Sequence, residues 1–168
     1  MWKFTGKERP EFALEPAPGQ ESVWDYPRPP VIVECNRIVV VEAAGRTIAK
    51  TSRALRVLET ASPPTVYLPP GDIDFSRLAD ASGSSFCEWK GQANYYALAT
   101  GGQVVAWEYR QPRAAFARLK GYLCFYPGRV VCTLDGERVK PQPGEFYGGW
   151  VTADIVGPFK GDPGSAGW

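Results

Sequence analysis

The sequence predicts a mainly β protein, in which a single compact antiparallel sheet curls into a barrel or a tent-like sandwich, with at most short helical turns. Three observations favour this fold class. Short runs rich in β-branched and aromatic residues recur through the middle of the chain, and Pro and Gly separate them. No apolar pattern of helical period reaches a dozen residues. No βαβ unit or Gly-rich phosphate loop is present, which disfavours an α/β nucleotide-binding fold.

The length and composition indicate one core domain flanked by two aromatic segments. The 168 residues are 44% hydrophobic, which suits a single domain with one core over residues 31–140. The two ends are rich in Pro and Gly but also hold four of the six tryptophans, and such side chains favour burial. We expect an N-terminal strap (1–30) rich in aromatic residues and Pro, and a C-terminal strap (141–168) rich in Gly and aromatic residues that packs on the core.

The first half of the core carries three β-branched runs, each of which predicts a strand: residues 31–35, 37–41 and 45–49. Residues 52–59 have an apolar pattern that suits either helical turns or an irregular strand, and both alternatives stay open. Proline pairs flank residues 65–68 and predict an extended piece at a sheet edge, because proline lacks the N–H that a central strand donates. A single helical turn is expected within residues 72–78.

Further strands are predicted in the second half of the core: residues 85–99, 103–109, 122–126 and 130–134. Gly91 lies inside the first of them and predicts a bulge or a bend, where the alternation of side chains would change. Asp135-Gly136 predicts a tight turn after the last strand.

The cysteines bear on both topology and cellular compartment. In a hairpin that turns at Pro127-Gly128, a two-residue loop places Cys124 opposite Val131, and a three-residue loop places it opposite Cys132. Both registers stay open. Since the N-terminal residues hold no apolar run that resembles a signal peptide, we expect a cytoplasmic protein whose cysteines are reduced.

Composition argues against several classes of function. The chain has no His, which removes Ser-His-Asp and Cys-His catalysis, His-ligated metals and imidazole pH switches. A net charge of +1 argues against a nucleic-acid partner held by phosphate neutralisation. No run of about 18 apolar residues could span a membrane, and no Cys-x-x-Cys pair suggests a zinc site. We therefore expect no metal, no cofactor, no nucleic acid and no membrane.

The densest group of chemically active side chains lies in residues 86–96, which hold a thiol, a carboxylate, an amine and two phenols. A bend at Gly91 would bring Lys90 beside Cys87, and a neighbouring ammonium favours the nucleophilic thiolate. In an enzyme, Cys87 or Lys90 would be the nucleophile, and Glu108 or a Tyr would carry the proton. The alternative is that Cys87 is a buried, inert side chain and that Lys90 pairs with Glu88 or with solvent.

A second group of candidate residues is aromatic and comes from segments that should be neighbouring strands. Aromatic side chains with polar tips line many small-molecule pockets, although filling of the core explains them equally well in a small domain. The candidate ligand-binding residues are Tyr67, Trp89, Tyr95, Tyr96, Trp107, Tyr109 and Tyr122.

Four segments together resemble the domain-of-unknown-function 427 family: residues 63–73, 86–93, 107–109 and 121–126. The resemblance extends from about residue 31 to 138, and the two end segments look like those of a longer bacterial subgroup. It implies a small β-rich protein without an assigned activity. Most of the family has Pro where this chain has Glu88. Nucleotidyltransferase chemistry, which needs paired carboxylates on a metal, is disfavoured because turn or helix capping explains Asp72 and Asp74.

Together, these observations predict a cytoplasmic β domain that binds a small polar molecule in an aromatic pocket, and they leave open whether it catalyses a reaction. The alternative from another class is a non-catalytic interaction or oligomerisation domain, in which the two straps form the surface of a homodimer.

Overall fold

The computed structural model describes residues 1–144 and 146–168, and strands are its main regular structure. The helices among these residues are four short 3-10 segments: η1 (Val23–Asp25), η2 (Pro70–Asp72), η3 (Phe75–Arg77) and η4 (Ala114–Leu119). The predicted mainly β class with short helical turns is therefore confirmed. The single curled sheet is not what the structure shows, because the strands divide among four sheets. None of the described helices has the length and hydropathy to cross a lipid bilayer.

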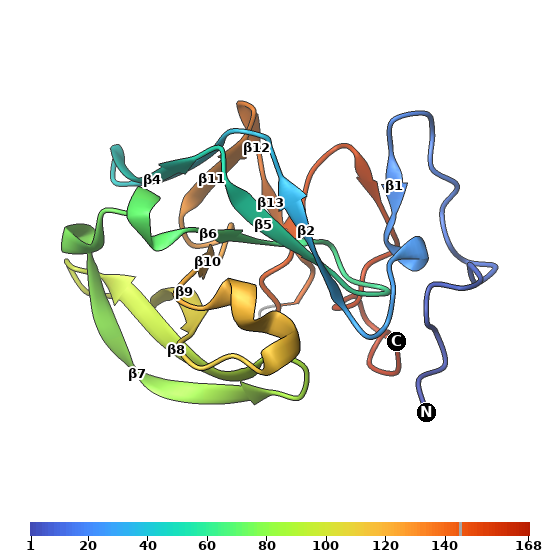
Figure 1. The fold of residues 1–168 in the computed structure, drawn as a ribbon. Helices are drawn as coiled ribbons and strands as arrows, with labels where there is room; N and C mark the ends of the chain where they lie inside the picture. Colours follow the sequence, from blue (N-terminus) through green and yellow to red (C-terminus); the bar gives the residue numbers. More distant parts are fainter. Residues whose placement is uncertain (145) are drawn as a thin grey trace.

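A seven-stranded antiparallel sheet forms the larger part of the molecule (Figure 1). From one edge to the other, its strands are β2 (Val31–Cys35), β5 (Ala54–Leu58), β6 (Thr65–Leu68), β10 (Leu123–Phe125), β9 (Val104–Tyr109), β8 (Gly91–Leu98) and β7 (Leu78–Cys87). Residues 52–59, which the sequence left open, thus contain strand β5. The predicted edge position of residues 65–68 is wrong, because β6 pairs with β5 on one side and β10 on the other. The flanking prolines lie just outside β6, so each residue of this strand keeps its N–H.

A smaller four-stranded sheet has the order β12 (Glu137–Arg138), β11 (Val131–Leu134), β3 (Val39–Ala43) and β4 (Arg46–Thr51). Strands β10 and β11 therefore belong to different sheets, and neither predicted hairpin register for Cys124 is formed. The chain leaves the large sheet after Phe125 and enters the small one at Val131. All four cysteines are free, as predicted.

The strand predicted over residues 85–99 is in fact part of a hairpin. Strand β7 ends at Cys87, residues 88–90 form the turn, and β8 begins at Gly91, which pairs with Cys87. Gly91 has a φ of +111°, and a Cβ there would lie 3.3 Å from the Gln111 carbonyl oxygen. Because other residues adopt this backbone only with strain, glycine fits the position.

Each face of the large sheet carries its own hydrophobic cluster. Val66 and Leu68 of β6 and Leu123 of β10 pack with Val41 and Ile48 of the small sheet, so this first cluster lies between the two sheets. The alternate residues point to the other face, as strand geometry requires. On that face, Tyr67, Trp107, Tyr109 and Cys124 form a second cluster together with Phe116 and Leu119 of η4.

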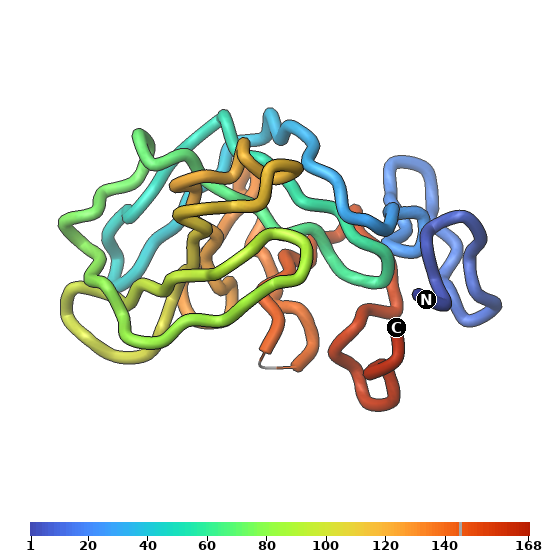
Figure 2. The backbone as a smooth tube through the Cα atoms, turned by 60° about the horizontal axis from the view of Figure 1, so that its bottom comes forward, coloured from blue at the N-terminus to red at the C-terminus, as the bar shows by residue number. Residues whose placement is uncertain are grey.

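The two ends of the chain pack together at one end of the molecule (Figures 1 and 2). Strand β1 (Glu21–Ser22) pairs in parallel with β15 (Ile155–Val156). Trp24 is fully buried in a third hydrophobic cluster that also contains Phe4 and Trp168. Strands β13 (Lys140–Pro141) and β14 (Trp150–Val151) pair with each other, and Trp150 packs into the first cluster and donates its backbone N–H to the Pro64 carbonyl. The end segments are thus integrated into the fold.

Candidate functional site

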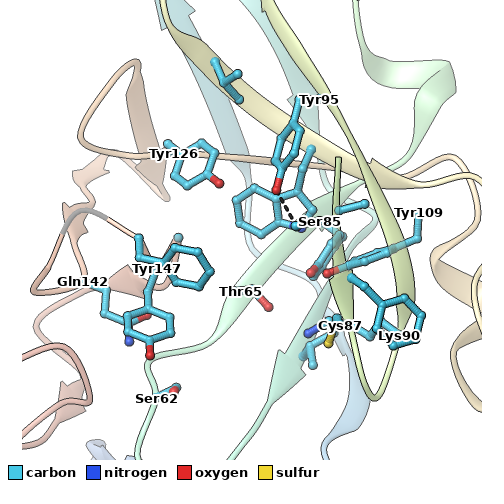
Figure 3. A pocket seen from close by; sticks show the side chains of 18 of the residues that line it. Ser62, Thr65, Ser85, Cys87, Lys90, Tyr95, Tyr109, Tyr126, Gln142 and Tyr147 are labelled. Carbon is cyan, nitrogen blue, oxygen red and sulfur yellow. Dashed lines mark hydrogen bonds between the residues drawn. The ribbon is translucent and has the colours of Figure 1, made fainter. Parts of the chain in front are cut away.

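A cavity of about 640 Å³ opens on the face of the large sheet that carries the second cluster. Strands β5 to β9 supply its floor and one wall, and residues 146–148 of the C-terminal segment line another side. This volume lies within the range of pockets that hold small organic molecules. Figure 3 shows Cys87, Lys90 and Tyr109 on one side of the pocket and Tyr126, Tyr147 and Gln142 on the other.

Aromatic rings make the floor and walls of the cavity apolar and rigid. Trp107 lies at its centre, with its ring centroid 6.1 Å from that of Tyr67 and 4.7 Å from that of Tyr126. Tyr109 follows on the same face of β9, with its centroid 6.3 Å from that of Tyr67. Tyr95, which lies opposite Trp107 in the strand pairing, completes the wall. A flat apolar group would find aromatic surface on several sides.

Lys90 brings a positive charge into this apolar setting. It is the last residue of the β7–β8 turn, where its carbonyl accepts a hydrogen bond from the Arg113 N–H at 3.0 Å. The residue is only 9% exposed and lines the cavity. Its ammonium lies 5.8 Å from the centroid of the Tyr109 ring and makes no ion pair or hydrogen bond within the described chain. The alternative pairing with Glu88 is therefore not formed.

Tyr67 adds a hydrogen-bond donor that also lacks a partner. Its side chain is fully buried beside the cavity, and its hydroxyl makes no hydrogen bond with the described residues. Burial raises the pKa of the Tyr67 phenol well above its usual range, so the hydroxyl stays protonated at neutral pH. Burial likewise raises the pKa of Tyr109, and the nearby Cys87 adds to the effect. Both phenols are therefore donors rather than bases.

Cys87 and Tyr95 place further polar atoms on the cavity wall. Cys87 is partly buried at the end of β7, on the Lys90 side of the pocket (Figure 3). The hydroxyl of Tyr95 shares a hydrogen bond with that of Ser85. The structure thus brings six of the predicted site residues around one hollow: Tyr67, Cys87, Lys90, Tyr95, Trp107 and Tyr109.

Other predicted site residues lie elsewhere. Glu108 points to the opposite face of β9, where it accepts hydrogen bonds from the Tyr96 hydroxyl at 2.6 Å and from Arg110 Nε at 2.7 Å. Successive side chains of a strand alternate between its faces, so Glu108 and Tyr96 do not line the cavity. Trp89 and Tyr122 pack against the second cluster without lining the cavity. Glu108 therefore cannot exchange a proton with Cys87 or Lys90 by direct contact.

Several cavity residues were not predicted because they come from the C-terminal segment. Gly148 fits closely against Trp107, since a Cβ there would lie 2.3 Å from its indole ring. Gln142 supports this wall by donating to the Lys160 carbonyl at 2.7 Å and accepting from the Gly149 N–H at 3.1 Å. The aromatic residues at 146 and 147 were the only sequence signal for this wall, and they did not indicate where the segment packs.

A smaller cavity of about 280 Å³ lies between the end segments and the core. Each of its charged side chains has an ion-pair partner: Arg56 binds Glu21 at 2.9 Å, Arg37 binds Asp154 at 3.2 Å, and Glu34 binds Arg118, which lies outside the cavity, at 3.5 Å. The hydrogen bonds from Arg56 lower the pKa of the Glu21 carboxyl. The charges of this cavity are therefore neutralised by ion pairs within the protein, and these ion pairs connect the ends of the chain to the core.

Both carboxylates considered for a metal are engaged in hydrogen bonds within the fold, and one of them caps a helix. Asp72 accepts hydrogen bonds from the Thr51 hydroxyl at 2.7 Å and from Arg53 at 3.1 Å. Asp74 caps η3 by accepting from the Ser76 N–H at 3.1 Å. In the part of the chain that the structure describes, no three His, Cys, Asp or Glu side chains gather as a metal site.

A family model described as "Domain of unknown function (DUF427)" matches residues 31–136. The match includes the strands of both larger sheets except β12, and with them Tyr67, Lys90 and Trp107. The cavity wall from the C-terminal segment lies outside it. No curated protein matches the chain.

Proposed function

The chain belongs to the domain of unknown function (DUF427) family, and we propose that it is a cytoplasmic binding protein whose cavity holds one small polar molecule. The aromatic walls would cover the body of this molecule. Lys90 and Tyr109 would bind its polar end. The four free cysteines are in keeping with a reducing compartment such as the cytoplasm.

One observation carries this proposal: the ammonium of Lys90, which has no hydrogen-bond or ion-pair partner within the described chain, borders an aromatic cavity, and the Tyr67 hydroxyl behind the cavity wall also has no partner there. A buried donor without an acceptor costs about 1–3 kcal/mol, so a protein keeps few of them. Core packing alone would be served better by Phe at position 67. A ligand that brings acceptor atoms would recover this cost on binding.

Binding is better supported than catalysis. The predicted catalytic group was Cys87, Lys90 and Glu108, and Glu108 lies on the other face of its strand. The phenols of Tyr67 and Tyr109 stay protonated, so neither is a general base near neutral pH. The one carboxylate among the described lining residues is Glu59, which forms an ion pair with Arg28, so the described cavity offers mainly donors and apolar surface.

An assembly role for the end segments is the second candidate function. Trp2, Phe12 and Leu14 are 39%, 45% and 58% exposed, which leaves apolar surface for a second copy. However, Phe12 already stacks on Trp168 of the same chain at 5.0 Å. Light scattering of the full chain tests this candidate, since a monomer at micromolar concentration would contradict the homodimer.

The binding proposal is tested by blocking the cavity. Thr65 lines it from β6, so Thr65→Phe would fill part of the space, whereas Thr47→Phe places the same side chain on the exposed face of β4. Two flat probes share a naphthalene ring: the neutral amide 2-naphthamide and the carboxylate 2-naphthoate. We expect at least one of them to bind the wild type in isothermal titration calorimetry. Thr65→Phe should weaken this binding at least about tenfold, and Thr47→Phe should not. Equal binding by both variants would contradict the proposed site.

A further inference from the structure

We infer that the ligand of this cavity is an organic carboxylate, and that Lys90 is the residue that binds its charge. This inference rests on the proposed function and names the chemical class of the ligand. It is carried by the placement of the charged groups, by the donors that surround Lys90, and by the aromatic surface beside them.

Among the residues that the structure describes, the charged side chains that line the cavity carry a net positive charge. They are Lys90, Arg129, Lys160 and Glu59. Glu59, the one acid in this described set, already has Arg28 as an ion-pair partner at 3.4 Å. Arg129 donates to the Val104 carbonyl at 2.7 Å and stacks over Tyr126, so it is engaged as well. Lys160 lies over the rings of Trp2 and Tyr147.

Lys90 therefore differs from the other cations of the cavity. It is largely buried, and no carboxylate of the described chain pairs with it. A buried charge costs free energy unless an opposite charge and hydrogen bonds satisfy it. A bound anion would meet this need, and a neutral ligand would not.

The number of donors at this end fits a carboxylate. Lys90 lies beside the ring of Tyr109, so one ammonium and one phenol hydroxyl border this end of the cavity (Figure 3). Two oxygens that share one negative charge can accept from such a set. A phosphate brings a larger charge and more acceptor oxygens, and would call for further cations or a row of backbone N–H groups. The neighbouring rings of Trp107 and Tyr95 suit a flat body attached to the carboxylate.

The experiment compares 2-naphthoate with 2-naphthamide, which has nearly the same shape without the charge. Titration calorimetry of the full-length wild type should give binding of the carboxylate at least about tenfold tighter than that of the amide, as expected for a charge-assisted hydrogen bond. Lys90→Met should remove this preference, and Lys90→Arg should retain much of it. Lys50→Met is the matched control, because Lys50 is exposed on β4 and does not line the cavity.

The possible outcomes show whether the carboxylate assignment fails alone or together with the binding proposal. Equal affinities of wild type for the carboxylate and the amide would overturn the carboxylate assignment and leave the binding proposal standing. So would tighter binding of 2-naphthyl phosphate than of 2-naphthoate. If neither naphthalene compound bound, both proposals would fall. The comparison of ligands on the wild type decides the question even if Lys90→Met does not fold, and circular dichroism checks each variant.

Discussion

Replacing Tyr67 by Phe should stabilise the unliganded protein, although the change removes a polar group from the site. The Tyr67 side chain is fully buried, and its hydroxyl has no hydrogen-bond partner in the described structure. Removing it abolishes a desolvation cost of about 1–3 kcal/mol. The small void left behind costs only ~0.3 kcal/mol at the usual cost per volume of cavity. The net change is therefore a gain of about 1 kcal/mol or more.

Thermal unfolding followed by circular dichroism measures this gain. For a domain of this size, about 1 kcal/mol raises the midpoint by about 2–4 °C. Urea unfolding should show a higher midpoint with an unchanged slope, because the exposed surface hardly changes.

Tyr96→Phe is the matched control, since the Tyr96 hydroxyl donates to Glu108 at 2.6 Å. Removing this bond leaves the carboxylate with one donor fewer and should lower the unfolding free energy by about 1 kcal/mol. The two Tyr→Phe changes should thus have opposite signs. A Tyr67→Phe protein less stable than the wild type would refute the reasoning, because it would mean that the hydroxyl is hydrogen-bonded in the folded protein.

Three further predictions concern the fold around the site. Trp24→Ala should lower the unfolding free energy by about 3–5 kcal/mol, because Trp24 is fully buried, and an unchanged urea midpoint would contradict its place in the core. Arg56 lowers the pKa of Glu21 below its ordinary 4.5, so the pair stabilises the fold above that pH and this contribution is lost as the pH falls. Glu21→Gln should therefore destabilise more at pH 7 than at pH 3 in urea unfolding. Gly91→Ala should cost about 1–3 kcal/mol because its φ is +111°, whereas Gly71→Ala, which has open space, should be nearly neutral by the same assay.

Local sequence patterns predicted most strands but not their partners. Strands β2, β3, β4, β9, β10 and β11 lie at or within two residues of the predicted runs, because β-branched and aromatic composition acts locally. The partner of a strand depends on contacts distant in sequence. Residues 65–68 were therefore assigned to an edge from their prolines, and β10 and β11 to one hairpin from their spacing, whereas the structure places β6 inside the large sheet and separates β10 from β11.

The hairpin of β7 and β8 explains why part of the candidate site could still be predicted. Its three-residue turn pairs Cys87 with Gly91 and Ser85 with Ala93, so near the turn the odd-numbered residues of both strands share one side of the hairpin, as they would in one continuous strand. Lys90 lies in the turn, where side chains do not alternate between two faces as they do in a strand. Its side chain can therefore line the same cavity as that of Cys87. The expected change of direction near Gly91 was correct, although a turn rather than a bulge produces it.

Strand alternation could have excluded Glu108 from the sequence alone. Trp107 and Tyr109 were predicted to face one pocket, and in a regular strand the residue between them must face the other way. The structure obeys this rule, and Glu108 pairs with Arg110 on the far face. The cavity is thereby left with an ammonium and phenol donors but without an acid of its own on that strand. An organic carboxylate would supply the group that this face of the sheet lacks.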